Sequence, residues 1–293
     1  GTTSFGTPVW VNNAVVEADV RIGIGEGSPV GPAGWCGGGK IILPGVAGRA
    51  TIEQNHRMLM SSRTILGLCE SNPMRSDMEE AADLAPLAFK VDVLVDSRER
   101  MVDVYSGDFR IEHRAALPKA REIWMTRMEP TDICVTHPGA GRERSLGGSF
   151  SMSFTAAHLA TKPDGIILLC LSAIDGYARE GRDLPYNETM TGRDVLRMRS
   201  DEIARDLVFS RGDMRTGTLQ FIVRRILETK RVFLVCDGIG PEEAAGYGFA
   251  ATYRSFDEAL DRALAEKGAG ATISVSFPKG PYTDWRCLPW REG

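Results

Sequence analysis

The chain has 293 residues, of which 43% are hydrophobic and 25% are charged, and its formal net charge at pH 7 is -4. These values are ordinary for a globular protein, and the length suits two domains. The slightly negative charge argues against a nucleic-acid-binding protein, which carries a basic face or tail. No apolar run approaches the roughly 18 residues of a transmembrane helix, so no membrane span is expected.

The six cysteines are widely spaced and include no C-x-x-C pair. This spacing predicts neither a zinc site nor a disulfide framework. The N-terminal sequence GTTSFGTPVW also lacks the basic and apolar regions of a secretory signal. We therefore expect a cytoplasmic protein.

The beginning of the chain has the pattern of short strands separated by glycine-rich loops. Residues 9–25 end in an alternation that includes Ile22 and Ile24, and they predict a strand region. After a loop rich in glycine and proline, residues 40–43 predict a second, short strand.

Two helices and a hairpin are expected next. Thr51 with Gln54, and Ser76 with Glu79, have the spacing of capping boxes and predict two helix starts. Residues 89–108 form two apolar runs around a polar centre, which predicts a β-hairpin.

From residue 132 onward, strand-like and helix-like segments alternate, which is typical of a layered α/β domain with a mostly parallel sheet. The expected strands cover residues 132–137, 165–173, 231–236 and 271–277, and the expected helices cover residues 150–161, 218–230 and 256–268. We place a boundary near Leu117 and Pro118, giving an α/β protein of two domains, 1–117 and 118–293. Ligands bind such sheets at the carboxyl ends of strands, which draws attention to the loop after residues 132–137.

The loop from Gly34 to Lys40, GWCGGGK, satisfies the first seven places of the phosphate-binding P-loop pattern. The eighth place requires Ser or Thr but holds Ile41, and the run that follows ends in Pro44 instead of opening a helix. A nucleoside triphosphatase is therefore not expected.

The same loop has features of a cofactor site. Gly37, Gly38 and Gly39 lack side chains and let a flat cofactor approach the backbone, while Lys40 can serve as a nucleophile or covalent anchor. His56, expected in the first turns of a helix, offers an imidazole that can bind a metal. Taken singly, a glycine-flanked lysine is also typical of a surface loop, and a helical histidine of packing.

Four segments, VNNAVVEADVRIGIGEGSP, AGWCGGGKIILPGVAG, TIEQNH and NPMRSDMEEAA, resemble the lactate racemase family of nickel-pincer-dependent racemases and epimerases. The resemblance covers residues 1 to about 115 and continues afterwards mainly in layout. It implies that residues 1–117 are the latter part of the family's N-terminal cofactor-binding domain. It also implies an isomerase that takes a hydride from a 2-hydroxyacid and returns it.

The resemblance further implies the cofactor and its ligands. The cofactor is nickel held by a pyridinium-thioamide/thiocarboxylate mononucleotide, the nickel-pincer nucleotide, covalently attached at Lys40. Gly37, Gly38 and Gly39 correspond to the close wall of its site, and His56 to the histidine that completes the nickel coordination. Sulfur and imidazole donors suit nickel.

The chain departs from the family at places that concern the substrate. Val30 follows Pro29 where many members have a histidine, and the family's Gln and Lys pair is absent from the segment HPGAGRERSLGGSF. We therefore expect a 2-hydroxyacid other than simple lactate. His137 is assigned proton transfer, or else it is a polar strand-end residue.

Three further residues complete the candidate site. Arg142 and Arg144 are assigned to a substrate carboxylate, or else they are solvated, and Ser149 is a further substrate contact. His113 is assigned no role.

Family members have further sequence before GTTSFGTPV, so we expect either that this chain is a processed or truncated piece or that a separate chain supplies that portion. An alternative function is a non-catalytic or partner-dependent subunit that retains the family fold. Val30 and the missing front portion favour this alternative, whereas Lys40 and His56 oppose it.

Overall fold

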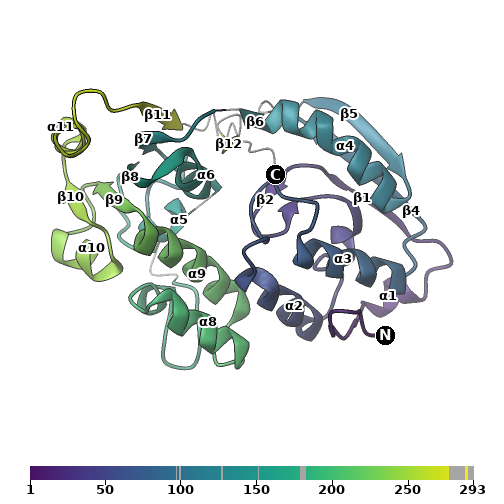
Figure 1. The fold of residues 1–293 in the computed structure, drawn as a ribbon. Coiled ribbons are helices and arrows are strands. Elements are labelled where there is room, and N and C mark those ends of the chain that lie inside the picture. The colour runs from purple at the N-terminus through teal and green to yellow at the C-terminus, as the bar shows by residue number, and fades with distance from the viewer. Residues whose placement is uncertain are drawn as a thin grey trace. The chain divides into compact units, whose positions relative to one another are not determined.

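The computed structural model describes residues 1–96, 98, 100–126, 128–150, 152–178, 183–276 and 288–289. The chain divides into two compact units, Gly1–Trp124 (unit 1) and Met125–Gly293 (unit 2) (Figure 1). The sequence placed the boundary at Leu117 and Pro118, which lie inside helix α4 (Phe109–Trp124). Among the described residues, no helix is long and apolar enough to cross a membrane.

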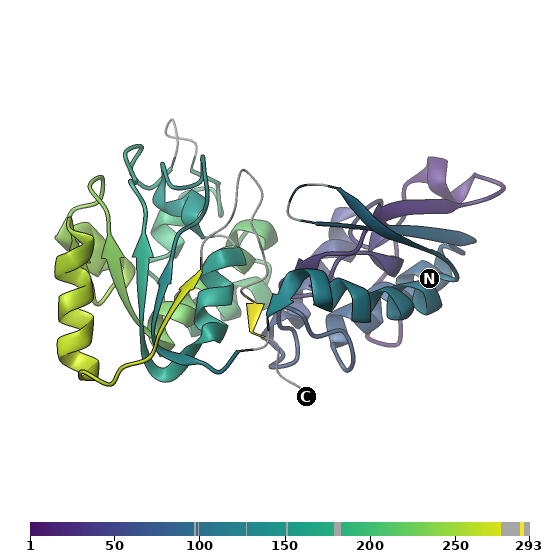
Figure 2. The same ribbon diagram turned by 90° about the horizontal axis from the view of Figure 1, so that it is seen from above.

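Unit 1 contains a three-stranded sheet in the order β1-β4-β5. Its strands are β1 (Ile22–Glu26), β4 (Phe89–Val95) and β5 (Met101–Gly107). The antiparallel pairing of β4 with β5 confirms the predicted hairpin, and β1 pairs with β4 in parallel. Helix α4 follows β5 and packs against β4 and β5 (Figure 2).

The two faces of this sheet differ in character at β1. Ile22 and Ile24 are 60% and 70% exposed, whereas Gly23 is buried. The glycines of β1 lie opposite two charged residues of β4, with Gly23 beside Lys90 and Gly25 beside Asp92. Lys90 and Asp92 therefore lie on the buried face of the sheet, whereas the apolar side chains of β1 are exposed.

The remaining elements of unit 1 are short and carry the candidate site. They are α1 (Asn13–Val16), β2 (Pro29–Val30), β3 (Gly34–Trp35), the 3-10 turn η1 (Gly38–Ile41), α2 (Arg49–His56), the 3-10 turn η2 (Arg57–Met60) and α3 (Pro73–Leu84). Only the end of the strand region predicted over residues 9–25 is a strand. Residues 13–16 form a helical turn because the Asn12 side chain caps it by accepting the amide of Ala14.

The two predicted capping boxes are wrong. Helix α2 begins before Thr51, whose hydroxyl donates to the carbonyl of Pro8 and so ties the N-terminal segment to the helix. Helix α3 begins at Pro73, capped by the Asn72 side chain, so Ser76 lies inside its first turn. Proline at the first helical position is favourable because it has no amide to leave unpaired.

Unit 2 contains a five-stranded sheet in the order β10-β9-β8-β7-β11, and every pairing in it is parallel. Its strands are β7 (Thr131–Thr136), β8 (Thr161–Cys170), β9 (Arg231–Val235), β10 (Ala251–Tyr253) and β11 (Ile273–Ser276). This sheet confirms the predicted α/β class.

Helices cover both faces of this sheet, which explains why residues 166–169 of β8 are apolar on both faces. Helices α6 (Met152–Ala160) and α9 (Met214–Thr229) share a core with one face, and α11 (Phe256–Lys267) packs on the other. The shorter elements of unit 2 are α5 (Leu146–Ser149), α7 (Gly192–Val195), α8 (Ser200–Val208), α10 (Pro241–Tyr247), β6 (Met125–Thr126) and β12 (Leu288–Pro289).

The strand order reverses at β7, which lies between β8 and β11. In open parallel sheets, ligands bind at the carboxyl ends of the strands at such a reversal. His137 follows β7 directly, and its backbone amide donates to the carbonyl of Ser276 at the end of β11, 3.3 Å away. The sequence-predicted His137 therefore lies at the edge of unit 2 where this rule places a ligand.

Candidate functional site

Lys40 lies in η1 and not in the strand predicted over residues 40–43. The β-branched run is drawn into a turn because Ile42 is buried against Ala82 of α3 and Phe109 of α4. Lys40 itself is half-buried, and its Nζ makes no hydrogen bond or ion pair with any residue that the structure describes. The ammonium group is thus held on an ordered turn without a partner in the described part of the chain.

His56 is the last residue of α2, later in the helix than the sequence predicted. Its Nδ1 donates to the carbonyl of Ile52 at 2.9 Å, and because a carbonyl can only accept, the neutral ring keeps an unprotonated Nε2. Burial lowers the pKa of His56, and the charge of Lys40 lowers it further. The two predicted cofactor residues therefore lie within electrostatic range of each other, and His56 is a neutral imidazole.

The three glycines before Lys40 face the interior of unit 1. A Cβ at Gly37 would lie 2.3 Å from Oδ2 of Asp92, and one at Gly38 would lie 3.1 Å from the carbonyl of Phe109. A Cβ at Gly39 would lie 3.1 Å from Ala82. Gly37 and Gly38 also have positive φ angles of 87° and 58°, which favour glycine. These residues let the loop approach α3, α4 and β4 closely, whereas their predicted contact with a cofactor stays a prediction.

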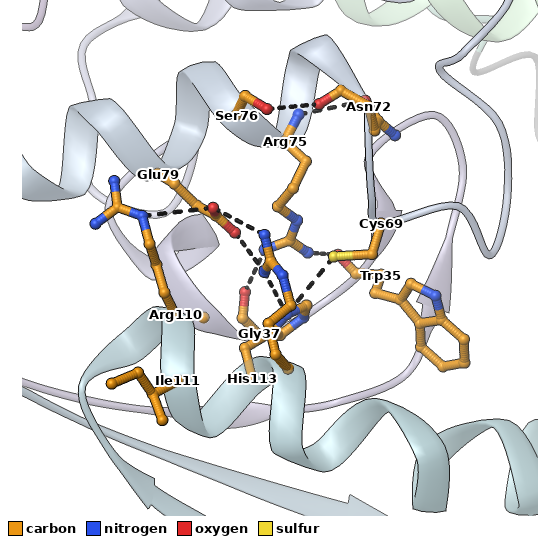
Figure 3. A network of polar contacts seen from close by, with 12 residues as sticks. Trp35, Gly37, Cys69, Asn72, Arg75, Ser76, Glu79, Arg110, Ile111 and His113 are labelled. Carbon is orange, nitrogen blue, oxygen red and sulfur yellow. Dashed lines mark hydrogen bonds and ion pairs between the residues drawn. The ribbon is translucent and has the colours of Figure 1, made fainter.

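Two buried side chains hold the carbonyl groups of the glycine loop. Arg75 of α3 donates to the carbonyl of Gly37 at 2.9 Å and to that of Trp35 (Figure 3). His113 of α4 donates through Nε2 to the carbonyl of Cys36 at 2.9 Å. Three successive carbonyls of the loop are therefore fixed from two different helices.

His113 is occupied on both ring nitrogens, so it has a structural role. Its Nδ1 accepts from Arg114 at 3.1 Å and lies 4.0 Å from Sγ of Cys69. Burial, together with the charges of Arg75 and Arg114, holds its pKa well below the usual value. Arg114 is in turn paired with Glu79 at 2.7 Å.

The residues that support the glycine loop, Arg75 and His113, were not predicted from the sequence. Arg75 lies within a segment that carried the family resemblance, but a helical arginine alone does not indicate burial. The clearest signal was in β4, where Lys90 and Asp92 occupy alternate positions of an otherwise apolar strand. Both side chains are fully buried and paired with each other.

His137 in unit 2 has a defined ring orientation. Its Nδ1 accepts from the backbone amide of Gly139 at 3.1 Å, and because an amide can only donate, the proton of the neutral ring is on Nε2. Burial lowers its pKa, while the charge of Glu143 opposes that shift. In this orientation the neutral imidazole can donate a hydrogen bond through Nε2, and its basic nitrogen is Nδ1.

The other predicted substrate residues have different surroundings. Arg142 is exposed, and Arg144 is paired with Asp175 through two nitrogens at 2.8 and 3.0 Å. Ser149 is fully buried, and its hydroxyl donates to the carbonyl of Leu146 at 2.6 Å. The structure does not gather these three side chains around one point, and their substrate contacts stay predictions.

The first part of the chain matches a family model, and two curated proteins are similar over most of the chain. Residues 1–67 match the lactate racemase N-terminal domain. The lactate racemase of Thermoanaerobacterium thermosaccharolyticum is 30% identical over 243 residues, covering 81% of this chain and 55% of that protein. The lactate racemase of Lactiplantibacillus plantarum is 27% identical over 283 residues, covering 96% of this chain and 65% of that protein.

Two solved structures are also similar. The lactate racemase apoprotein from Thermoanaerobacterium thermosaccharolyticum matches with a TM-score of 0.78 at 27% identity, covering 94% of this chain and 65% of that one. A protein from Thermotoga maritima shares the fold, with a TM-score of 0.60 at 15% identity over 95% of this chain and 69% of that one. The chain thus spans between about half and two thirds of the curated relatives that it matches.

Proposed function

Because the chain belongs to the lactate racemase family, we propose that it provides the cofactor-bearing part of a racemase or epimerase of 2-hydroxyacids. The cofactor that we propose is the nickel-pincer nucleotide, attached covalently at Lys40. His56 is the proposed protein ligand of the nickel. The reaction is hydride abstraction from the substrate followed by its return.

The observation that carries this proposal is the state of Lys40 and His56. An amine that forms a covalent bond must be reachable and free of an ion pair, and Nζ of Lys40 has no partner among the described residues. A histidine that binds a metal through one ring nitrogen commonly donates a hydrogen bond from the N–H of the other to a carbonyl, which orients the ring. His56 donates such a hydrogen bond to the carbonyl of Ile52. These two residues fit the proposed cofactor.

The described residues also fit a metal whose other ligands come from a bound cofactor. Among them, no group of three His, Cys, Asp or Glu side chains could hold a metal ion. A single imidazole suits a nickel ion whose other donors belong to the nucleotide. The lowered pKa of His56 keeps this imidazole neutral and able to bind at neutral pH.

The bound cofactor would supply a hydride acceptor and donor, and the chain's own residues would do the rest. Lys40 anchors the group through an amide-like bond that removes the lysine charge. His56 orients the metal through Nε2. In proton transfer, His137 would take the substrate's hydroxyl proton on Nδ1, the nitrogen that accepts the Gly139 amide, and would return it when the hydride returns, while exposed Arg142 attracts the carboxylate.

The substrate that we propose is a 2-hydroxyacid other than simple lactate. Val30 lies in β2 and pairs with Gly34 of β3, at the start of the glycine loop. At this place the apolar isopropyl group of Val30 replaces a group that can titrate. A substrate with a larger or less polar side chain would be accommodated better beside valine than beside an imidazole.

A second candidate is a non-catalytic or partner-dependent subunit that keeps the fold. The pairing of Arg144 with Asp175 favours it, because a paired guanidinium is less available to a substrate carboxylate. Under this alternative, Lys40 stays unmodified, or it is loaded only when a complementary chain is present.

Intact-protein mass spectrometry with peptide mapping, combined with nickel analysis, tests the proposal on protein from a host that makes the cofactor. We expect a mononucleotide-sized adduct on Lys40 together with nickel. Lys40→Arg keeps the charge but should lose the adduct, whereas Lys119→Arg should retain it. An unmodified Lys40 without nickel would refute the proposal and support the second candidate.

The nickel assignment has its own test. We expect His56→Gln to carry the adduct but to lose nickel faster during dialysis against a chelator. His158→Gln, in unit 2, is the matched control. Wild-type nickel retention in His56→Gln would contradict the ligand assignment.

A further inference from the structure

The turn that carries Lys40 lacks a capping group of its own. Its N-cap residue is Gly37, which has no side chain and makes no capping hydrogen bond. The first amide of the turn, that of Gly38, instead donates to Oδ2 of Asp92 at 2.7 Å. An aspartate normally caps a helix that follows it directly. Here the carboxylate comes from β4, 54 residues later in the chain.

Strand β1 makes room for this carboxylate. A Cβ on Gly25 would lie 3.1 Å from Oδ1 of Asp92 and 2.9 Å from Nζ of Lys90. A Cβ on Gly23 would lie 2.9 Å from Cδ of Lys90. The two glycines of β1 therefore form the floor under a buried ion pair.

The other oxygen of this carboxylate is held by Lys90. Nζ of Lys90 pairs with Oδ1 of Asp92 and also donates to the carbonyl of Val91 at 3.0 Å. Glu112 of α4 is 3% exposed, and its carboxyl oxygens have no hydrogen-bond partner among the described residues. Burial and the charge of Asp92 raise the pKa of Glu112, which favours its protonated form beside the ion pair. Among the described residues, Asp92 therefore accepts from Lys90 on Oδ1 and from the Gly38 amide on Oδ2.

We propose that Asp92 is a positioning residue for Lys40, fixing through the Gly38 amide the turn that presents the lysine to its cofactor. The role in cofactor attachment rests on the proposed function, whereas the effect on the turn does not. Lys90 supports this role by pairing with the other oxygen of Asp92. The hydrogen bond between Asp92 and Gly38 is specific to the turn of Lys40, because Gly38 is the first residue of that turn and lies two residues before the lysine.

The wild-type chain without cofactor provides the first test. Amide hydrogen exchange at Gly38, measured by NMR, should be slowed about 10- to 100-fold relative to an unbonded loop amide, as for one hydrogen bond to a charged acceptor. The amide of Gly31, in the preceding loop, is the reference. Exchange of Gly38 at the reference rate would overturn the proposal without any substitution.

A matched pair of variants separates positioning from stability. Lys90→Met with Asp92→Asn removes both charges but keeps an acceptor oxygen for Gly38. Lys90→Met with Asp92→Leu removes the acceptor as well, in a similar volume. We expect the second variant to exchange Gly38 about tenfold faster than the first, while amides of β5 exchange equally in both. Equal rates at Gly38 would refute the proposal.

Cofactor loading then tests the consequence for Lys40. In a host that makes the cofactor, the Asn-containing variant should load Lys40, and the Leu-containing variant should load it about tenfold less, as after one lost hydrogen bond. The loaded fraction should follow Gly38 exchange and not the melting temperature. If wild-type Lys40 is never loaded, the proposed function fails while the exchange results still decide the positioning of the turn. If both variants load equally, the positioning role fails and the proposed function stands.

Discussion

Glu112 makes the stability of unit 1 depend on pH in a direction opposite to that of most carboxylates. Burial raises its pKa from 4.5 to about 8, and the charge of Asp92 contributes to this shift. Between these two values the folded chain keeps the proton that the unfolded chain has lost. Stability must therefore fall as the pH rises through this interval, and it becomes independent of Glu112 above about pH 8.

The expected slope follows from the linkage relation. One proton bound in the folded state and none in the unfolded state gives a loss of about 1.4 kcal/mol per pH unit. Nearby Lys90 and Arg75 favour the charged form of Glu112, so they limit how far this pH interval extends and not the slope within it. Glu112→Gln should remove the slope, since an amide of similar size is neutral like the protonated acid but cannot ionise.

The assay is equilibrium unfolding in urea at several pH values between about 5 and 8, read from hydrogen exchange of α4 and β4 peptides. The wild type should lose stability relative to Glu112→Gln as the pH rises. Glu122→Gln, which removes an exposed carboxylate from the same helix, should follow the wild type. Parallel curves for the wild type and Glu112→Gln would refute the reasoning.

Three further outcomes are expected. Arg75→Met leaves two loop carbonyls without their buried donor, so the free energy of unfolding in urea should fall by about 2 to 6 kcal/mol; an unchanged value would contradict that role. Gly37→Ala should lower stability by roughly 3 kcal/mol or more, because strain at positive φ adds to a clash. Gly6→Ala, at a similar φ of 80° with nothing within 4 Å, isolates the strain alone, and equal losses would exclude the clash. In an NMR titration the midpoints of His113 and His137 should both lie below 6.5, with His113 the lower, and the reverse order would contradict the assigned burial.

The fold of unit 2 could be predicted because each of its main strands and helices is indicated by residues that are close together in the sequence. Residues 166–169 are apolar on both faces of β8, as expected of a strand covered by helices on both sides. The helices between the strands carry their own periodicity and caps, as in α9, where Asp213 accepts the amide of Thr216. Each of these signals lies within one short window of sequence.

The turn around Lys40 could not be predicted in the same way. Locally, Ile41 and Ile42 favour a strand. The turn forms because Asp92 and α3 and α4 hold it, and these elements lie far along the chain. Long-range packing here overrides local propensity.

Candidate site residues could be proposed from the sequence only where residue type and the family resemblance indicate chemistry. Lys40 and His56 were proposed as anchor and ligand in this way, and these roles stay predictions. His113 was assigned no role, since nothing in its neighbourhood in the sequence shows that its partner is the carbonyl of Cys36. The contacts of a buried polar residue depend on the fold, and those contacts decide its role.

The inward-facing glycines have a consequence for protein engineering. The heptapeptide GWCGGGK contains the amine but none of the side chains that shape the turn, because these come from α3, β4 and α4. Grafted alone onto another scaffold, it would give a flexible loop with a lysine at its end. The smallest transferable part for presenting this lysine is a segment that extends from β1 through α4.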